Sequence, residues 1–131
     1  MTDDQVNSPK HYMGPFECIE LSSKYSFCAG NAIKYVWRHL QKGKPVQDLE
    51  KAKWYIDRLT ANQEALRTVV VSSAFDQSND VDRLLDILID YKDDNMDGWA
   101  NAKAFWFAVK CHDKIAASNA LKDMIDEAKR K

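Results

Sequence analysis

The chain has 131 residues, of which 45% are hydrophobic and 30% charged, and its net charge is −1. These values are typical of one folded domain and argue against a disordered chain. No apolar run is long enough for a membrane span, and the acidic start at residues 1–4 does not fit a signal peptide. Four glycines and three prolines are too few for a β-sandwich or barrel, which needs turns every ~8–12 residues. We therefore expect an all-α, cytoplasmic protein.

The first third of the chain predicts an extended arm and two helices. Residues 1–14 are polar and carry turn signals, and residues 15–24 favour a short helix that begins at a proline. Gly30 or Asn31 is expected to cap the next helix, which Gly43 ends. The buried face of this second helix is marked by apolar residues at the spacing i, i+3, i+4 and i+7, namely Ile33, Val36, Trp37 and Leu40.

The rest of the chain has little glycine or proline and predicts long helices. Asp48 is suited to cap the first of them, and His112–Ile115 marks a break in the last. The helices expected here cover residues 49–66, 81–92 and 99–131. Residues 68–73 contain a short β-prone run, which is either a link in the core or one short strand.

Together these elements predict a compact bundle of five or six helices with an N-terminal arm. We expect a single structural domain in which residues 1–67 form the core segment with the candidate site. Residues 68–131 are then a helical extension packed on that segment. A 15.1 kDa helical chain with four tryptophans has more apolar helix surface than one small core can bury, so a homo-oligomer is expected.

Positive charge is concentrated in residues 21–47, which contain no acid. The cations there are Lys24, Lys34, Arg38, Lys42 and Lys44. Lys34, Arg38 and Lys42 are four residues apart, so they form a stripe along one helix face. Such a stripe favours an anion such as a phosphate, although a solvated basic face has the same pattern. Duplex nucleic acid needs a larger basic surface, and no sequence-specific nucleic acid partner is expected.

Four groups of residues follow one another in a distinctive order. They are Asn7-x-Pro9-x-His11-Tyr12, Glu17-Cys18-Ile19-Glu20, Phe27-x-x-Gly30-Asn31-Ala32-Ile33-Lys34-Tyr35-Val36-Trp37-Arg38 and Asp48-Leu49-x-Lys51-Ala52-x-Trp54-Tyr55-x-Asp57-x-Leu59. Over about residues 6–60 this order resembles a family of small phage-encoded proteins long classed as a domain of unknown function. That family includes a deoxynucleoside monophosphate kinase of short-tailed coliphages. The resemblance implies nucleotide binding and phosphoryl transfer in the host cytoplasm, and the chain has no P-loop motif.

The candidate site combines the basic stripe with polar and aromatic residues of the same segment. Arg38 and Lys34 would stabilise the transferred phosphoryl group, with His11 as the third catalytic candidate. The residues expected to bind the nucleotide are Tyr12, Asn31, Lys34, Tyr35, Arg38 and Lys42. Trp54 and Tyr55 are interpreted as core or subunit-interface residues. His39 and His112 are interpreted as surface or partly buried histidines.

Glu17 and Glu20 are three residues apart and therefore share a helix face, where paired carboxylates could hold Mg²⁺ beside phosphates. The alternative is that one of them pairs with Arg38 or Lys34 across the helices. The four-carboxylate pattern of all-α nucleotide pyrophosphatases is incomplete, because no second Glu-x-x-Asp follows. Pyrophosphohydrolysis is therefore the weaker functional alternative.

Two further functions remain open from the sequence. The basic stripe could sequester a nucleotide or a nucleotide signal without turnover. Alternatively, residues 68–131 could bind and inhibit a host protein through their acidic, aromatic-bearing helices.

Overall fold

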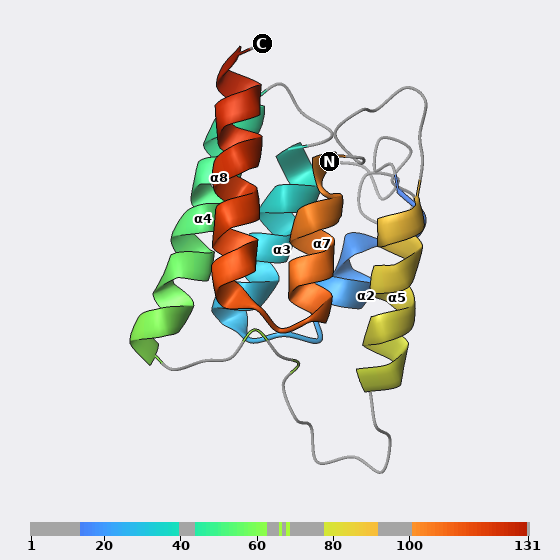
Figure 1. The fold of residues 1–131 in the computed structure, drawn as a ribbon. Coiled ribbons are helices and arrows are strands. Elements are labelled where there is room, and N and C mark those ends of the chain that lie inside the picture. The colour runs from blue at the N-terminus through green and yellow to red at the C-terminus, as the bar shows by residue number, and fades with distance from the viewer. Residues whose placement is uncertain are drawn as a thin grey trace, which may run out of the picture.

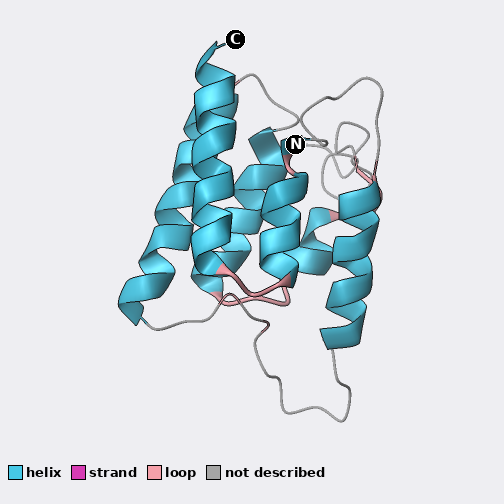
Figure 2. Cartoon of the chain, viewed as in Figure 1, coloured by secondary structure: helices cyan, strands magenta, loops and turns pink. Residues whose placement is uncertain are grey.

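The computed structural model describes residues 14–39, 44–62, 66, 68, 78–91 and 101–130. These ranges contain six helices and no strand, which confirms the all-α prediction (Figure 2). The helices are α2 (Cys18–Ser22), α3 (Phe27–His39), α4 (Pro45–Asn62), α5 (Ser78–Asp90), α7 (Lys103–Lys110) and α8 (Lys114–Arg130). The expected arm at residues 1–13, and with it His11 and Tyr12, lies outside the described residues, as does Lys42.

The helices pack in a bundle whose order in space differs from their order in the chain. Helix α4 packs between α3 and α8, α7 packs between α8 and α5, and α2 packs on α3. Figure 1 shows that α3 and α4, α4 and α8, α8 and α7, and α7 and α5 each run in opposite directions. The bundle therefore has an up-and-down arrangement, with α4 and α5 at its two edges.

A single hydrophobic core joins the N-terminal and C-terminal helices. On α3 the predicted positions Ile33, Val36 and Trp37 are all buried. Trp37 meets the buried Trp106 of α7 edge to face, with 6.2 Å between the ring centroids. Because residues from both halves contribute to the same core, α7 and α8 help to hold the helices that carry the candidate site.

Three helix starts differ from the prediction, each for a local reason. Helix α3 begins at Phe27, one turn before the expected cap, because the amide of Gly30 already donates to the Ser26 carbonyl at 2.8 Å. Helix α4 begins at Pro45, since proline is well suited to a first helical position. Helix α2 begins after Glu17 rather than at the earlier proline.

Other predicted boundaries can be compared in part. The break expected in the last helix is confirmed between α7 and α8, where His112 adopts a positive φ of 56°. Thr68 forms an isolated antiparallel bridge with Tyr25. The remainder of the β-prone run, residues 69–73, lies outside the described residues.

Gly30 allows α2 and α3 to approach closely, and this gives a test of the packing. A Cβ atom at this position would lie 2.7 Å from the backbone oxygen of Ser22. Helix propensity alone predicts that Gly30→Ala stabilises the protein by about 1 kcal/mol. We expect instead a loss of about 1–3 kcal/mol in the free energy of unfolding, because a backbone atom has to move.

Urea denaturation would measure this change, with Asn119→Ala on the exposed surface of α8 as the control that shifts stability little. A Gly30→Ala variant as stable as the parent protein would contradict the close packing.

Candidate functional site

The basic stripe predicted on α3 is present at two of its three positions. Lys34 and Arg38 lie four residues apart on α3, and both are exposed. Asn31 lies one turn earlier, where its Nδ2 donates to the backbone carbonyl of Phe27 at 2.8 Å. Asn31 is therefore inside the helix, and the prediction that Gly30 or Asn31 caps it is wrong.

Arg38 lies beside a buried carboxylate of α4. Its Nε lies 3.9 Å from Oδ2 of Asp48, whose side chain is only 6% exposed while that of Arg38 is 55% exposed. Asp48 was expected as a helix cap, but it lies in the first turn of α4, and its amide donates to the carbonyl of Lys44 at 3.1 Å. The carboxylate therefore lies near one edge of a largely exposed guanidinium, at a separation longer than a hydrogen bond.

Two stacked tyrosines lie where α3 meets α4. The rings of Tyr35 and Tyr55 are nearly parallel, with an interplanar angle of 12° and 6.0 Å between centroids. Lys34 and Lys51 place their Nζ atoms 5.0 Å and 5.4 Å from the centroid of the Tyr35 ring. Both distances are within the range of cation–π attraction. One aromatic pair is thus bordered by a cation from each helix.

The aromatic surface continues along α4 and back to the start of α3. Trp54 packs its ring edge to face with Tyr55 at 5.0 Å, and the guanidinium of Arg58 lies 4.6 Å from the Trp54 centroid. Phe27 contacts Tyr55 at 6.0 Å. We call this surface the α3–α4 aromatic-basic face; it comprises Phe27, Lys34, Tyr35, Arg38, Lys51, Trp54, Tyr55 and Arg58.

Much of the α4 side of this face was missed from the sequence. Trp54 is 55% exposed, so it is not a core residue of this chain, whereas Tyr55 is partly buried against the core. The signal that could have found them is the spacing of Lys51, Trp54, Tyr55 and Arg58. These residues follow i, i+3, i+4 and i+7, which places them on one helix face.

The charges of α4 are sorted between its two sides. Glu50 pairs with Lys129 of α8 at 3.7 Å, and Asp57 accepts a hydrogen bond from Ser118 of α8 at 2.8 Å. Lys51 and Arg58 form no ion pair within the described part of the chain. Two acids of α4 therefore contact α8, while the third, Asp48, lies beside Arg38 of α3. Lys51 and Arg58 border the aromatic rings, and Lys53 pairs with Asp57.

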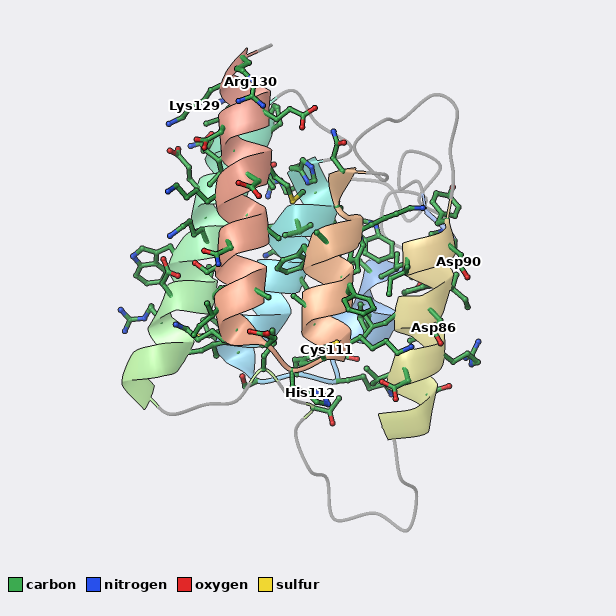
Figure 3. All side chains as sticks on the ribbon, viewed as in Figure 1. Asp86, Asp90, Cys111, His112, Lys129 and Arg130 are labelled. Carbon is green, nitrogen blue, oxygen red and sulfur yellow. The ribbon has the colours of Figure 1, made fainter. Side chains whose placement is uncertain are left out.

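Another group of acidic residues lies on α5, at the opposite edge of the bundle from α4. Figure 3 shows Asp86 and Asp90 there, and Lys129 and Arg130 at the C-terminal end of α8. Asp86 is paired with Lys110 of α7. Helix α5 is thus an acidic edge of the bundle, whereas α4 carries equal numbers of acids and cations.

The two glutamates expected to hold a metal have a structural role in the fold. Glu17 and Glu20 form a reciprocal capping box at the start of α2, in which the Glu17 amide donates to Glu20 Oε2 at 3.1 Å. Neither forms the alternative ion pair with Lys34 or Arg38 in the described structure. No cluster of three or more metal-ligating side chains occurs among the described residues.

Comparison with known proteins gives a family match to the N-terminal part of the chain. Residues 6–57 match a protein family described as a protein of unknown function (DUF3310), which confirms the resemblance expected from the sequence. The matched segment contains α2, α3 and most of α4, together with His11, Tyr12 and Lys42. No curated protein and no solved structure matches the chain. Among the described helices, none combines the length and apolar character needed to cross a membrane.

The contact between Arg38 and Asp48 leads to a prediction about stability. Arg38→Gln is expected to lower the free energy of unfolding by about 1–3 kcal/mol, because it leaves a buried carboxylate without its partner. Adding Asp48→Asn should recover part of that loss. Lys34→Gln, at an exposed position without an ion pair, should change stability by less than about 0.5 kcal/mol. Strictly additive losses in the double variant, measured by urea denaturation, would contradict the pairing.

His39 gives the structure a pH dependence. Burial lowers the pKa of His39 from its usual 6.5, with the hydrogen bond to the Val36 carbonyl and the charge of Asp48 opposing the change. The unfolded chain therefore binds more protons than the folded chain just below pH 6.5. Stability is consequently full above pH 6.5 and falls as the pH drops below it.

We expect His39→Gln to flatten the dependence of the free energy of unfolding on pH between about 5 and 7. The control is His112→Asn, at an exposed position whose positive φ asparagine tolerates. An unchanged pH profile in the His39 variant would show that this group does not carry the effect.

Proposed function

We propose that the α3–α4 aromatic-basic face binds a nucleotide, and that the protein is a phage-encoded deoxynucleoside monophosphate kinase without a P-loop. The observation that carries the proposal is the position of Arg38. Arg38 lies 3.9 Å from a buried carboxylate, and it shares an exposed helix face with Lys34, whose Nζ lies over the ring of Tyr35. Phosphate-binding cations and a flat aromatic group are thus within reach of one small ligand.

The two cations suit different parts of phosphoryl transfer. Catalysis of this reaction depends on positioning and on stabilising charge that spreads over the transferred group, more than on covalent chemistry. A guanidinium can hold two phosphate oxygens at once, and an ammonium acts as a point charge.

The family segment supplies the other proposed contacts. His11, Tyr12 and Lys42 lie within residues 6–57, and we assign His11 to proton transfer or phosphate contact, Tyr12 to the base and Lys42 to phosphate. Where Mg²⁺ is needed, it would arrive bound to the triphosphate, since Glu17 and Glu20 are already hydrogen-bonded at the helix start.

A product assay separates this proposal from its alternatives. The purified protein is incubated with each deoxynucleoside monophosphate, a panel of triphosphates and Mg²⁺, and the nucleotides are resolved by ion-exchange chromatography. Diphosphate formation is the expected result. Pyrophosphate release would indicate a pyrophosphohydrolase, and tight binding without products would indicate sequestration.

Variants assign the activity to the face. Lys34→Gln should weaken nucleotide binding about tenfold or more, because a charged hydrogen bond to phosphate is lost. The Arg38→Gln/Asp48→Asn double variant should do the same without leaving the carboxylate unpaired. Arg83→Gln, at an exposed position on α5, is the control expected to bind normally. Absence of both binding and products in the parent protein would refute the proposal.

A further inference from the structure

The exposure of Trp54 is not explained by a single small ligand at Lys34 and Arg38. Trp54 is 55% exposed and Phe27 is 74% exposed, and they contact opposite sides of the cluster through Tyr55, at 5.0 Å and 6.0 Å. Single exposed apolar side chains are common on protein surfaces, but Trp54 and Phe27 both belong to one aromatic cluster, and such grouped apolar surface is typical of binding sites. The face thus offers aromatic surface from two helices.

Cations accompany these rings along the length of the face. Arg58 lies 4.6 Å from the Trp54 ring centroid and restrains the indole, while Lys51 and Lys34 border Tyr35. None of these three cations forms an ion pair in the described structure. From Phe27 to Arg38 the face extends about 16 Å along α3, which exceeds the length of one nucleotide.

We infer that the α3–α4 aromatic-basic face also binds single-stranded nucleic acid, without reading base identity. Unpaired bases stack on exposed aromatic rings, and a positively charged surface follows the phosphate backbone. In a duplex the base faces are stacked on one another, so a duplex could bind only through contacts between its phosphates and the cations. This function goes beyond the proposed nucleotide binding, and it depends on Trp54 and Arg58, to which that proposal assigns no role.

Charge complementarity favours a polyanion over a protein partner at this face. Two of the three acids of α4, Glu50 and Asp57, are engaged with α8. The acidic residues Asp86 and Asp90 are at the other edge of the bundle. Among the described residues, a phosphate backbone would therefore meet Lys34, Lys51 and Arg58 beside the rings, with the carboxylate of Asp48 largely buried near Arg38.

Binding can be measured by fluorescence anisotropy with labelled oligothymidylate and oligouridylate of about 12 nucleotides, within the site sizes of single-strand binders. Both probes should bind the full chain at low salt. Trp54→Ala is expected to weaken binding by about 5- to 150-fold, the effect of losing one stacked base. Phe107→Ala is the matched control, because Phe107 is 57% exposed on α7, away from the α3–α4 face.

Salt titration tests the cations separately from the rings. Neutralising about three phosphates predicts a slope near −2 for the logarithm of affinity against the logarithm of salt concentration, since each contact on a single strand contributes about −0.7. Arg58→Gln should make the slope shallower by about 0.7. Arg83→Gln on α5 should leave the slope unchanged. Circular dichroism of each variant should show parental helicity, since Trp54 and Arg58 are exposed.

Three results would overturn the inference: no oligonucleotide binding at low salt, equal weakening by Trp54→Ala and Phe107→Ala, or a duplex competitor as effective as a single strand. A second copy of the chain is the competing occupant. If Trp54→Ala dissociates an oligomer in sedimentation experiments and oligonucleotides do not bind, the face is a subunit interface.

The experiments also distinguish a failure of the single-strand inference from a failure of the proposed nucleotide binding. Mononucleotide binding that is lost in Lys34→Gln, with no oligonucleotide binding in the parent protein, removes only the single-strand inference. Oligonucleotide binding without mononucleotide binding removes only the proposed kinase.

Discussion

Helix α4 has to pack against α3 on one side and α8 on another, and this requirement determines the surface of the molecule. Its apolar residues Leu49, Ala52, Ile56 and Leu59 are at most 1% exposed. Burying each large side chain contributes about 1.5–3 kcal/mol, so a rotation of α4 about its axis would be costly. With that rotation fixed, Trp54 has no place in the core. The exposed aromatic surface is thus a consequence of core packing.

The same fixed rotation separates the charges. Glu50 and Asp57 contact α8, where Glu50 pairs with Lys129 and Asp57 accepts a hydrogen bond from Ser118. Each of these exposed contacts contributes little to stability. Their importance is that they keep two of the three acids of α4 on its α8 side, while the third, Asp48, is buried near Arg38 of α3. Within the described residues Lys51 and Arg58 form no ion pair, so they add to the positive potential of Lys34 although the chain as a whole is slightly negative.

The buried side of α3 could be predicted because it follows from periodicity alone: Ile33, Val36 and Trp37 recur at helical spacing. The start of α3 could not, since Gly30 resembles a helix boundary in sequence but serves the contact with Ser22 of α2. The α4 part of the face escaped prediction for a related reason. Tryptophan is on average a highly buried residue type, so Trp54 was expected in the core or an interface. Only the packing of α4 on two neighbours decides which side of the helix faces solvent.

The family match ends at residue 57, but the structure of that segment depends on the rest of the chain. One side of α4 packs on α8, and Trp37 of α3 meets Trp106 of α7. Residues 6–57 alone would leave both apolar surfaces exposed, so they are too small a unit to hold Arg38 and Asp48 in position. The C-terminal helices therefore stabilise the positions of α3 and α4. The residues proposed to contact a ligand come from α3, α4 and the segment before them. A chain with this family segment must cover α4 on the side away from α3, with its own helix or with another subunit.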